Sequence, residues 1–115
     1  MAEPTAPGGA PDDLQAHFDV IPGTGQQPTI VRAIGDIDLA NASQYHAALT
    51  EAAATSGEIT ADLTAVTYCD SAAIHVLITV ARQKHLTLLI PGTGPITTML
   101  KIAGLDQIAT VITPD

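Results

Sequence analysis

The segment from Asp62 to Ile74 constrains the fold of this chain more than any other stretch. It overlaps Glu58–Leu63, where alternating apolar residues predict a buried strand. Apolar residues at helical spacing follow as far as about Lys84, and Asp70 stands where a helix cap is expected. The sequence therefore predicts a strand, a short turn and a helix in succession, with Asp70 and Ser71 at the junction.

Strand and helix patterns alternate along the rest of the chain. The further predicted strands are Gln15–Ile21, Thr29–Gly35, Leu86–Ile90 and Ile108–Ile112. The further predicted helices run from Asn41 to about Ser56 and from Ile96 to Ala103. The turn residues between the first two strands predict a hairpin, and the later alternation predicts right-handed crossovers. The fold class is therefore α/β, with a mostly parallel sheet that carries an antiparallel edge.

Local patterns also predict which helix faces are buried. Asn41 and Gln44 fit a capping box, with Asn in the Ser/Thr position. The expected core-facing stripe of the first helix consists of Tyr45, Leu49, Ala52 and Ala53. The stripe expected in the helix after Asp70 consists of Ile74, Leu77, Ile78 and Ala81.

Length and composition limit the classes of partner. The 115 residues suit one domain, expected over residues 14–115 after an Ala/Pro/Gly-rich disordered leader at 1–13. The net charge of −8 and the 3% aromatic content argue against nucleic acid and anionic membranes. A basic protein partner fits this charge, although acidity also serves solubility. The lone Cys69 and the absence of a signal-peptide pattern indicate a soluble cytoplasmic protein.

Two segments resemble the STAS domain of bacterial anti-sigma factor antagonists. Gly35–Ala42 reads Gly-Asp-Ile-Asp-Leu-Ala-Asn-Ala, which is similar to that family's Gly-(Glu/Asp)-(Leu/Ile)-Asp strand end. The stretch 62–71 reads Asp-Leu-Thr-Ala-Val-Thr-Tyr-Cys-Asp-Ser, which is similar to its Asp-Leu-Ser-x-Val-x-(Phe/Tyr)-x-Asp-Ser segment. The resemblance implies a single STAS-like domain with helices packed mainly on one side of the sheet.

The resemblance also implies a function. In similar proteins the serine after the motif aspartate, here Ser71, is phosphorylated by an anti-sigma factor with serine kinase activity. The unphosphorylated antagonist binds that factor and frees a sigma factor, and phosphorylation reverses the exchange. The expected partner-binding residues are Asp36, Asp38, Asn41, Asp70, Ser71, Ala72, Ala73 and His75. The chain itself would be no enzyme and would need no cofactor, since ATP belongs to the kinase.

The sequence departs from the family pattern directly after Ser71. Family members commonly continue with Ser/Thr and Gly, whereas this chain has Ala72 and Ala73. The departure keeps open a STAS adaptor subunit of a transporter or stress-signalling assembly, in which Ser71 is only a first-turn residue.

A hydrolase that uses Ser71 or Cys69 is a third hypothesis. Ser71 and His75 share a helix face, but the sequence specifies no nucleophile elbow and no orienting acid. Cys69 reads more simply as a small buried residue. No metal site is expected, because the histidines have no ligand spacing with one another.

Overall fold

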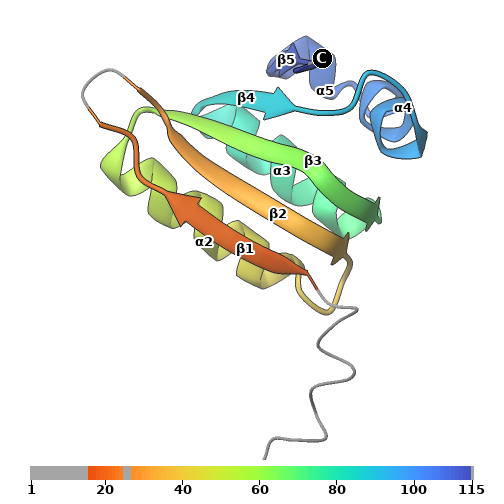
Figure 1. Ribbon diagram of the computed structural model, residues 1–115, viewed down its shortest axis with the longest axis horizontal. Coiled ribbons are helices and arrows are strands. Elements are labelled where there is room, and N and C mark those ends of the chain that lie inside the picture. The colour runs from red at the N-terminus through yellow and green to blue at the C-terminus, as the bar shows by residue number, and fades with distance from the viewer. Residues whose placement is uncertain (1–15, 25–26, 115) are drawn as a thin grey trace, which may run out of the picture.

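A computed structural model of the chain describes residues 16–24 and 27–114, and the expected leader lies outside these ranges. The described residues form five strands and four helices, which are labelled in Figure 1. The strands are β1 (His17–Ile21), β2 (Thr29–Ile37), β3 (Glu58–Cys69), β4 (His85–Leu89) and β5 (Thr110–Ile112). The helices are α2 (Ala42–Thr55), α3 (Ser71–Gln83), α4 (Pro95–Ile102) and α5 (Leu105–Ile108).

The sheet has the strand order β1-β2-β3-β4-β5. Strands β1 and β2 form an antiparallel pair, and the other three pairs are parallel. Helices α2 and α3 cover one face of the sheet, and the viewer of Figure 1 looks onto the other face. The predicted α/β class, edge hairpin and one-sided helix packing are confirmed.

Several element boundaries differ from the prediction. Strand β2 continues to Ile37 and β3 continues to Cys69, well past Leu63. The predicted strand from Ile108 was wrong at its start, because Ile108 ends the short helix α5 and β5 begins at Thr110. The alternation that marks a strand is interrupted in β3, where Thr64 and Ala65 are both exposed.

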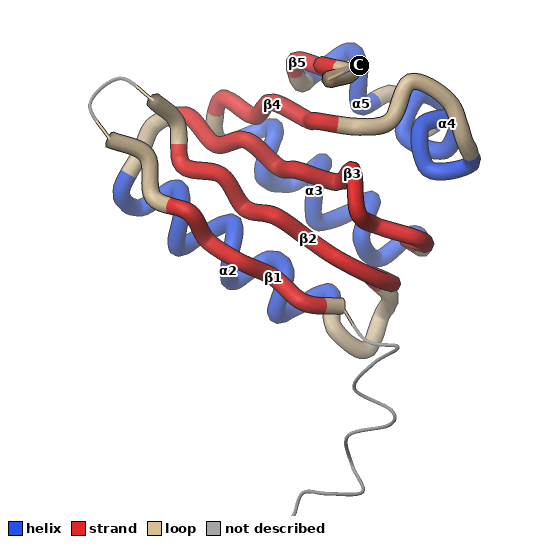
Figure 2. Tube along the Cα trace, viewed as in Figure 1, coloured by secondary structure: helices blue, strands red, loops and turns tan. Residues whose placement is uncertain are grey.

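The interruption has a cause in the pairing of β2 with β3. The register shifts between Arg32 and Ile34 and again between Gly35 and Asp36, and each time β3 advances one residue further than β2. Gly35 has φ 95°, a left-handed conformation that glycine adopts without strain. These bulges bend β3 as it approaches α3, and the bend can be followed along the strand tube in Figure 2.

The core between the sheet and the helices is mostly aliphatic. Tyr45, Leu49 and Ala52 are buried as predicted, and Tyr45 stacks on Phe18 with ring centroids 5.1 Å apart. The buried residues of α3 are Ala73, Ile74, Val76, Leu77 and Val80, whereas Ile78 and Ala81 are only partly buried. The prediction is therefore confirmed for Ile74 and Leu77, but the buried face is rotated away from Ile78 and Ala81, because this helix contacts α2 and α5 as well as the sheet.

Candidate functional site

The candidate site lies where β2 and β3 end side by side. Ile37 pairs with Cys69, and the Asp70 backbone N–H donates to the Ile37 carbonyl at 3.1 Å. Because the two strands are parallel, the turns that follow them meet at the same end of the sheet. We call this end the Ser71 rim; it consists of Asp36, Asp38, Leu39, Tyr68, Asp70, Ser71, Ala72 and His75.

Asp70 connects the two turns of the rim. Its Oδ1 atom accepts the backbone N–H groups of Ala72 at 2.9 Å and Ala73 at 3.4 Å, which caps α3 as predicted. Its Oδ2 atom accepts the Leu39 N–H at 3.1 Å, from the turn that follows β2. One carboxylate therefore binds the start of the helix and the neighbouring turn at the same time.

The turn after β2 is fixed by further hydrogen bonds. Asp38 Oδ1 accepts the Ala40 N–H at 3.0 Å, and Asn41 Oδ1 accepts the Asp38 N–H at 3.0 Å. The Asn41 side-chain amide also donates to the Asp36 carbonyl at 3.0 Å. The predicted capping box at Asn41 was wrong, since its buried side chain is engaged by the turn and makes no bond to the helix.

Asp36 joins β2 to β3 at the second bulge. The Thr67 hydroxyl donates a hydrogen bond to Asp36 Oδ1. Thr67 and Tyr68 are both exposed there, although neighbours along a regular strand point to opposite faces. The bulge thus directs the Tyr68 ring outward, with 51% of the residue exposed.

The predicted site residues differ in accessibility. Ser71 is the first residue of α3 and is exposed. His75, one turn later in the helix, is also exposed. Ala72 is half-buried, but Ala73 is completely buried and belongs to the core. A partner at the rim therefore reaches Ser71, His75 and part of Ala72, while the Ala73 methyl group faces inward.

Leu39 is the most prominent apolar residue of the rim. It is 80% exposed at the tip of the turn that Asp38, Asn41 and Asp70 hold. An exposed apolar side chain on a fixed turn loses little conformational freedom when a partner binds it. In the sequence, Leu39 is one of several small or apolar residues near the predicted site, and the structure distinguishes it as a large apolar side chain that is 80% exposed.

The rim carries uncompensated negative charge. Within residues 16–24 and 27–114, neither Asp36, Asp38 nor Asp70 forms an ion pair. The described part of the chain has no group of three His, Cys, Asp or Glu side chains placed to hold a metal ion. Its helices are also too short or too polar to span a membrane.

Cys69 is buried behind the rim. Burial and, secondly, the negative charge of Asp70 raise the pKa of Cys69 to about 11. The thiolate is the nucleophilic form of cysteine, so its population at neutral pH is very small. This environment argues against Cys69 as a catalytic thiol and fits the predicted small buried residue.

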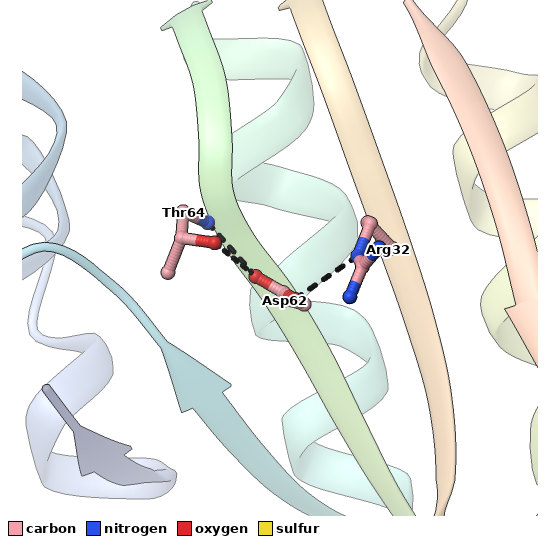
Figure 3. Close-up of polar contacts among 3 residues, drawn as sticks. All are labelled: Arg32, Asp62 and Thr64. Carbon is pink, nitrogen blue, oxygen red and sulfur yellow. Dashed lines mark hydrogen bonds and ion pairs between the residues drawn. The ribbon is translucent and has the colours of Figure 1, made fainter. Parts of the chain in front are cut away.

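A second polar cluster lies on the open face of the sheet. Figure 3 shows Asp62 between Thr64, two residues ahead on β3, and Arg32 on β2. The Asp62 carboxylate accepts the Thr64 hydroxyl at 2.7 Å, the Thr64 N–H at 3.0 Å and Arg32 Nε at 3.3 Å. These bonds span the first bulge and so help to set the path of β3 toward Ser71. Asp62 stands out in the sequence only as a motif residue, because its pairing with Arg32 depends on the register between β2 and β3.

A sequence model of the family described as "Mlab, STAS domain" matches residues 23–113. The chain belongs to the STAS domain family. The predicted resemblance is thereby confirmed at the level of the domain, and the matched range includes both motifs and the whole Ser71 rim. Among curated protein sequences, no relative of this STAS domain was found.

Solved structures with the same fold include two anti-sigma factor antagonists. One, from Mycobacterium paratuberculosis, is 18% identical with a TM-score of 0.73, over 88% of this chain and 87% of that one. The other is SpoIIAA in its unphosphorylated form, 16% identical with a TM-score of 0.65, over 86% and 90% of the two chains. At these identities the similarity establishes the fold.

The fold also occurs within a much larger membrane protein. The murine anion transporter Slc26a9 is 10% identical to this STAS domain, with a TM-score of 0.63. The match covers 90% of this chain and 22% of the transporter. The same fold thus occurs both in small anti-sigma factor antagonists and within an anion transporter.

Proposed function

We propose that this STAS domain is an anti-sigma factor antagonist that binds an anti-sigma factor with serine kinase activity and is controlled by phosphorylation of Ser71. The observation that carries the proposal is the position of Ser71. It is exposed at the first residue of α3, beside the Asp70 cap and the Leu39 turn. A soluble domain of this kind would work in the cytoplasm of a bacterium.

The surface around Ser71 defines the chemistry of the partner. Leu39 and Tyr68 supply exposed apolar area, and Asp36, Asp38 and Asp70 supply negative charge. A complementary partner offers an apolar pocket bordered by Lys or Arg side chains, because opposite charges speed encounter and select the correct partner. His75 extends this surface along α3.

Phosphorylation would proceed by direct transfer between the two proteins. The Ser71 hydroxyl gives its proton to a base of the kinase, and its oxygen forms a bond to the γ-phosphorus of the ATP that the kinase binds. The bond from that phosphorus to the bridging oxygen breaks, and ADP leaves. The antagonist supplies only the acceptor hydroxyl, so it acts as a substrate and not as a catalyst.

The added phosphate would oppose binding by its charge. A phosphoserine adds about −1.5 to −2 charges at neutral pH, next to the Asp70 carboxylate. This makes the rim more strongly negative and enlarges Ser71 within the contact surface. We expect a weakened interface with an unchanged core, because Ser71 is exposed and makes no part of the buried cluster.

The test is affinity capture from a lysate of the organism that encodes the chain, with wild type, Ser71→Ala and Ser71→Glu as baits. We expect wild type and Ser71→Ala to retain a serine-kinase anti-sigma factor and Ser71→Glu to lose it. Thr50→Glu is a matched control, because Thr50 is an exposed hydroxyl residue in the middle of α2. Incubation of the captured kinase with ATP should then phosphorylate wild type and leave Ser71→Ala unmodified.

A constitutive adaptor is the second candidate, supported by the presence of this fold in an anion transporter. In that case the same membrane-transport or signalling subunits would be captured by all four baits. An identical set of partners on Ser71→Ala and Ser71→Glu would contradict the phosphoswitch. Loss of the kinase from Thr50→Glu as well would indicate a general charge effect in place of a specific one.

A further inference from the structure

We propose that the Asp70 carboxylate couples Ser71 to the Leu39 turn, so that negative charge added at Ser71 loosens the exposed apolar tip of the rim. This inference rests on the proposed function, because it takes Ser71 as the modified residue. It adds the structural route by which phosphorylation would change the binding surface. Asp70 is a positioning residue, because it acts by holding Leu39 in place.

The geometry gives Asp70 two separate tasks. Oδ1 holds the N–H groups of Ala72 and Ala73 at the start of α3, and Oδ2 holds the N–H of Leu39. Both oxygens belong to one planar, rigid carboxylate group. A rotation or displacement of the Asp70 side chain that alters one set of bonds therefore alters the other.

A phosphate on Ser71 would disturb Asp70 in two ways. Its oxygens compete for the free or weakly held N–H groups of the first turn, which favour anions. Its charge also repels the neighbouring carboxylate. The weaker of the two Asp70 cap bonds, to Ala73 at 3.4 Å, is the one most readily replaced. Both effects move the carboxylate from its place between the helix and the turn.

The consequence is confined to one residue of the turn. Ala40 N–H is held by Asp38, and the Asp38 N–H is held by Asn41, so neither bond involves Asp70. Leu39 is the residue whose N–H depends on Asp70, and it is also the residue that is 80% exposed. Loss of this bond would free the apolar anchor while the rest of the turn keeps its bonds. A mobile anchor binds less tightly, because ordering it on association costs conformational entropy.

The experiment measures amide hydrogen exchange by NMR on the isolated chain, with phosphoserine incorporated at position 71 during translation. We expect the Leu39 amide to exchange about tenfold faster than in the unmodified chain, equivalent to about 1.4 kcal/mol of lost protection. Asp70→Asn should give a similar increase at Leu39, because the Asn oxygen still caps α3 while its NH₂ group cannot accept the Leu39 N–H. The Ala40 amide is the internal control and should keep its rate in both.

Two further variants separate the coupling from general electrostatics. Asp36→Asn removes a rim charge that makes no bond to Leu39, and Ser71→Ala removes the hydroxyl without adding charge. Both should leave the Leu39 exchange rate unchanged. The proposal is overturned if phosphoserine leaves the Leu39 rate unchanged, if Asp70→Asn does so, or if Ala40 accelerates equally. Since no partner is present, these outcomes are independent of kinase capture: a kinase released by Ser71→Glu, with Leu39 exchange unchanged, would support the switch and reject the coupling.

Discussion

Asp62 lies within β3 and Asp70 directly follows the last residue of that strand, yet their surroundings differ. Each accepts the backbone N–H of the residue two positions ahead, Thr64 at 3.0 Å and Ala72 at 2.9 Å. Asp62 is only 7% exposed and its second oxygen meets the Arg32 guanidinium. Asp70 is more accessible, and its second oxygen meets a neutral backbone N–H. The same local hydrogen bond thus forms once beside a compensating cation and once without one.

The difference separates a fixed structural element from one that responds to charge. Burial acts to raise the Asp62 pKa, but the net shift is downward, because Thr64 hydrogen bonds and the Arg32 charge favour the ionised carboxylate. The Asp70 carboxylate has no cation to anchor it among the described residues. It can therefore be displaced by a new negative charge or attracted by a cationic partner.

The largest expected effect concerns the stability contributed by Asp62. Asp62→Ala leaves Arg32 unpaired and leaves the Thr64 N–H and hydroxyl without their acceptor. We expect a loss of about 3 kcal/mol in the free energy of unfolding, because the buried carboxylate accepts three hydrogen bonds, one of them from a charged group. Urea denaturation followed by circular dichroism measures it. Asp38→Ala is the matched control, with an expected loss of about 1 kcal/mol or less. Equal losses in the two variants would contradict the distinction between the cluster and the rim.

A smaller effect is expected for Leu39, and it concerns the affinity for the partner and not the stability of the fold. Leu39→Ser should weaken binding to the captured anti-sigma kinase by about 2 kcal/mol, or roughly 30-fold. Ile102→Ser is the control, because Ile102 is also 80% exposed but lies on α4. Titration calorimetry with each variant gives the affinities. The role of the Leu39 turn is rejected if Ile102→Ser weakens binding as much as Leu39→Ser does.

The cap at Asp70 should contribute about 1 kcal/mol to stability. Asp70→Ala removes both the α3 cap and the Leu39 bond, and we expect that loss in the free energy of unfolding. Asp70→Asn should cost less than Asp70→Ala, because Asn is an equally good cap and only the Leu39 bond is lost. Denaturation of the two variants side by side tests this order. A larger loss for Asn than for Ala would show that the cap is not the main contribution.

The smallest effect is a pH dependence that belongs to Asp62. Because its pKa is lowered in the folded chain, its stabilisation is fully present above the ordinary carboxyl pKa of about 3.9. It is lost as the pH falls through the lowered folded value. Below about pH 4 the unfolding free energy should therefore fall less steeply for Asp62→Asn than for wild type. If the unfolding free energies of the two proteins change with pH in parallel, the acid sensitivity comes from groups other than Asp62.

Much of the fold follows from short-range patterns. The strand and helix order, the antiparallel edge and the Asp70 cap were predictable, because each depends on residues within a few positions of one another. The length of β3 was not, since its two bulges interrupt the alternation that marks a strand. The face of α3 was misplaced because the helix is covered on more than one side.

The site was predictable as a set of positions but not as an arrangement. Motif residues such as Asp70 and Ser71 could be named from the sequence. The local pattern at Asn41 suggested a helix cap, yet the buried turn uses that side chain for Asp36 and Asp38. Both options at Asn41 are short-range, and the bonds that the structure uses lie within residues 36–41.

By itself, the sequence determined the α/β order of elements, an aliphatic core, a strongly negative surface and a serine at the start of a helix. The tertiary structure decided which distant residues meet: Arg32 with Asp62, Asp36 with Thr67, and Leu39 with Asp70. All three contacts join β2 or its following turn to β3 or its following turn. They depend on a parallel register with two bulges, and no local propensity encodes that register.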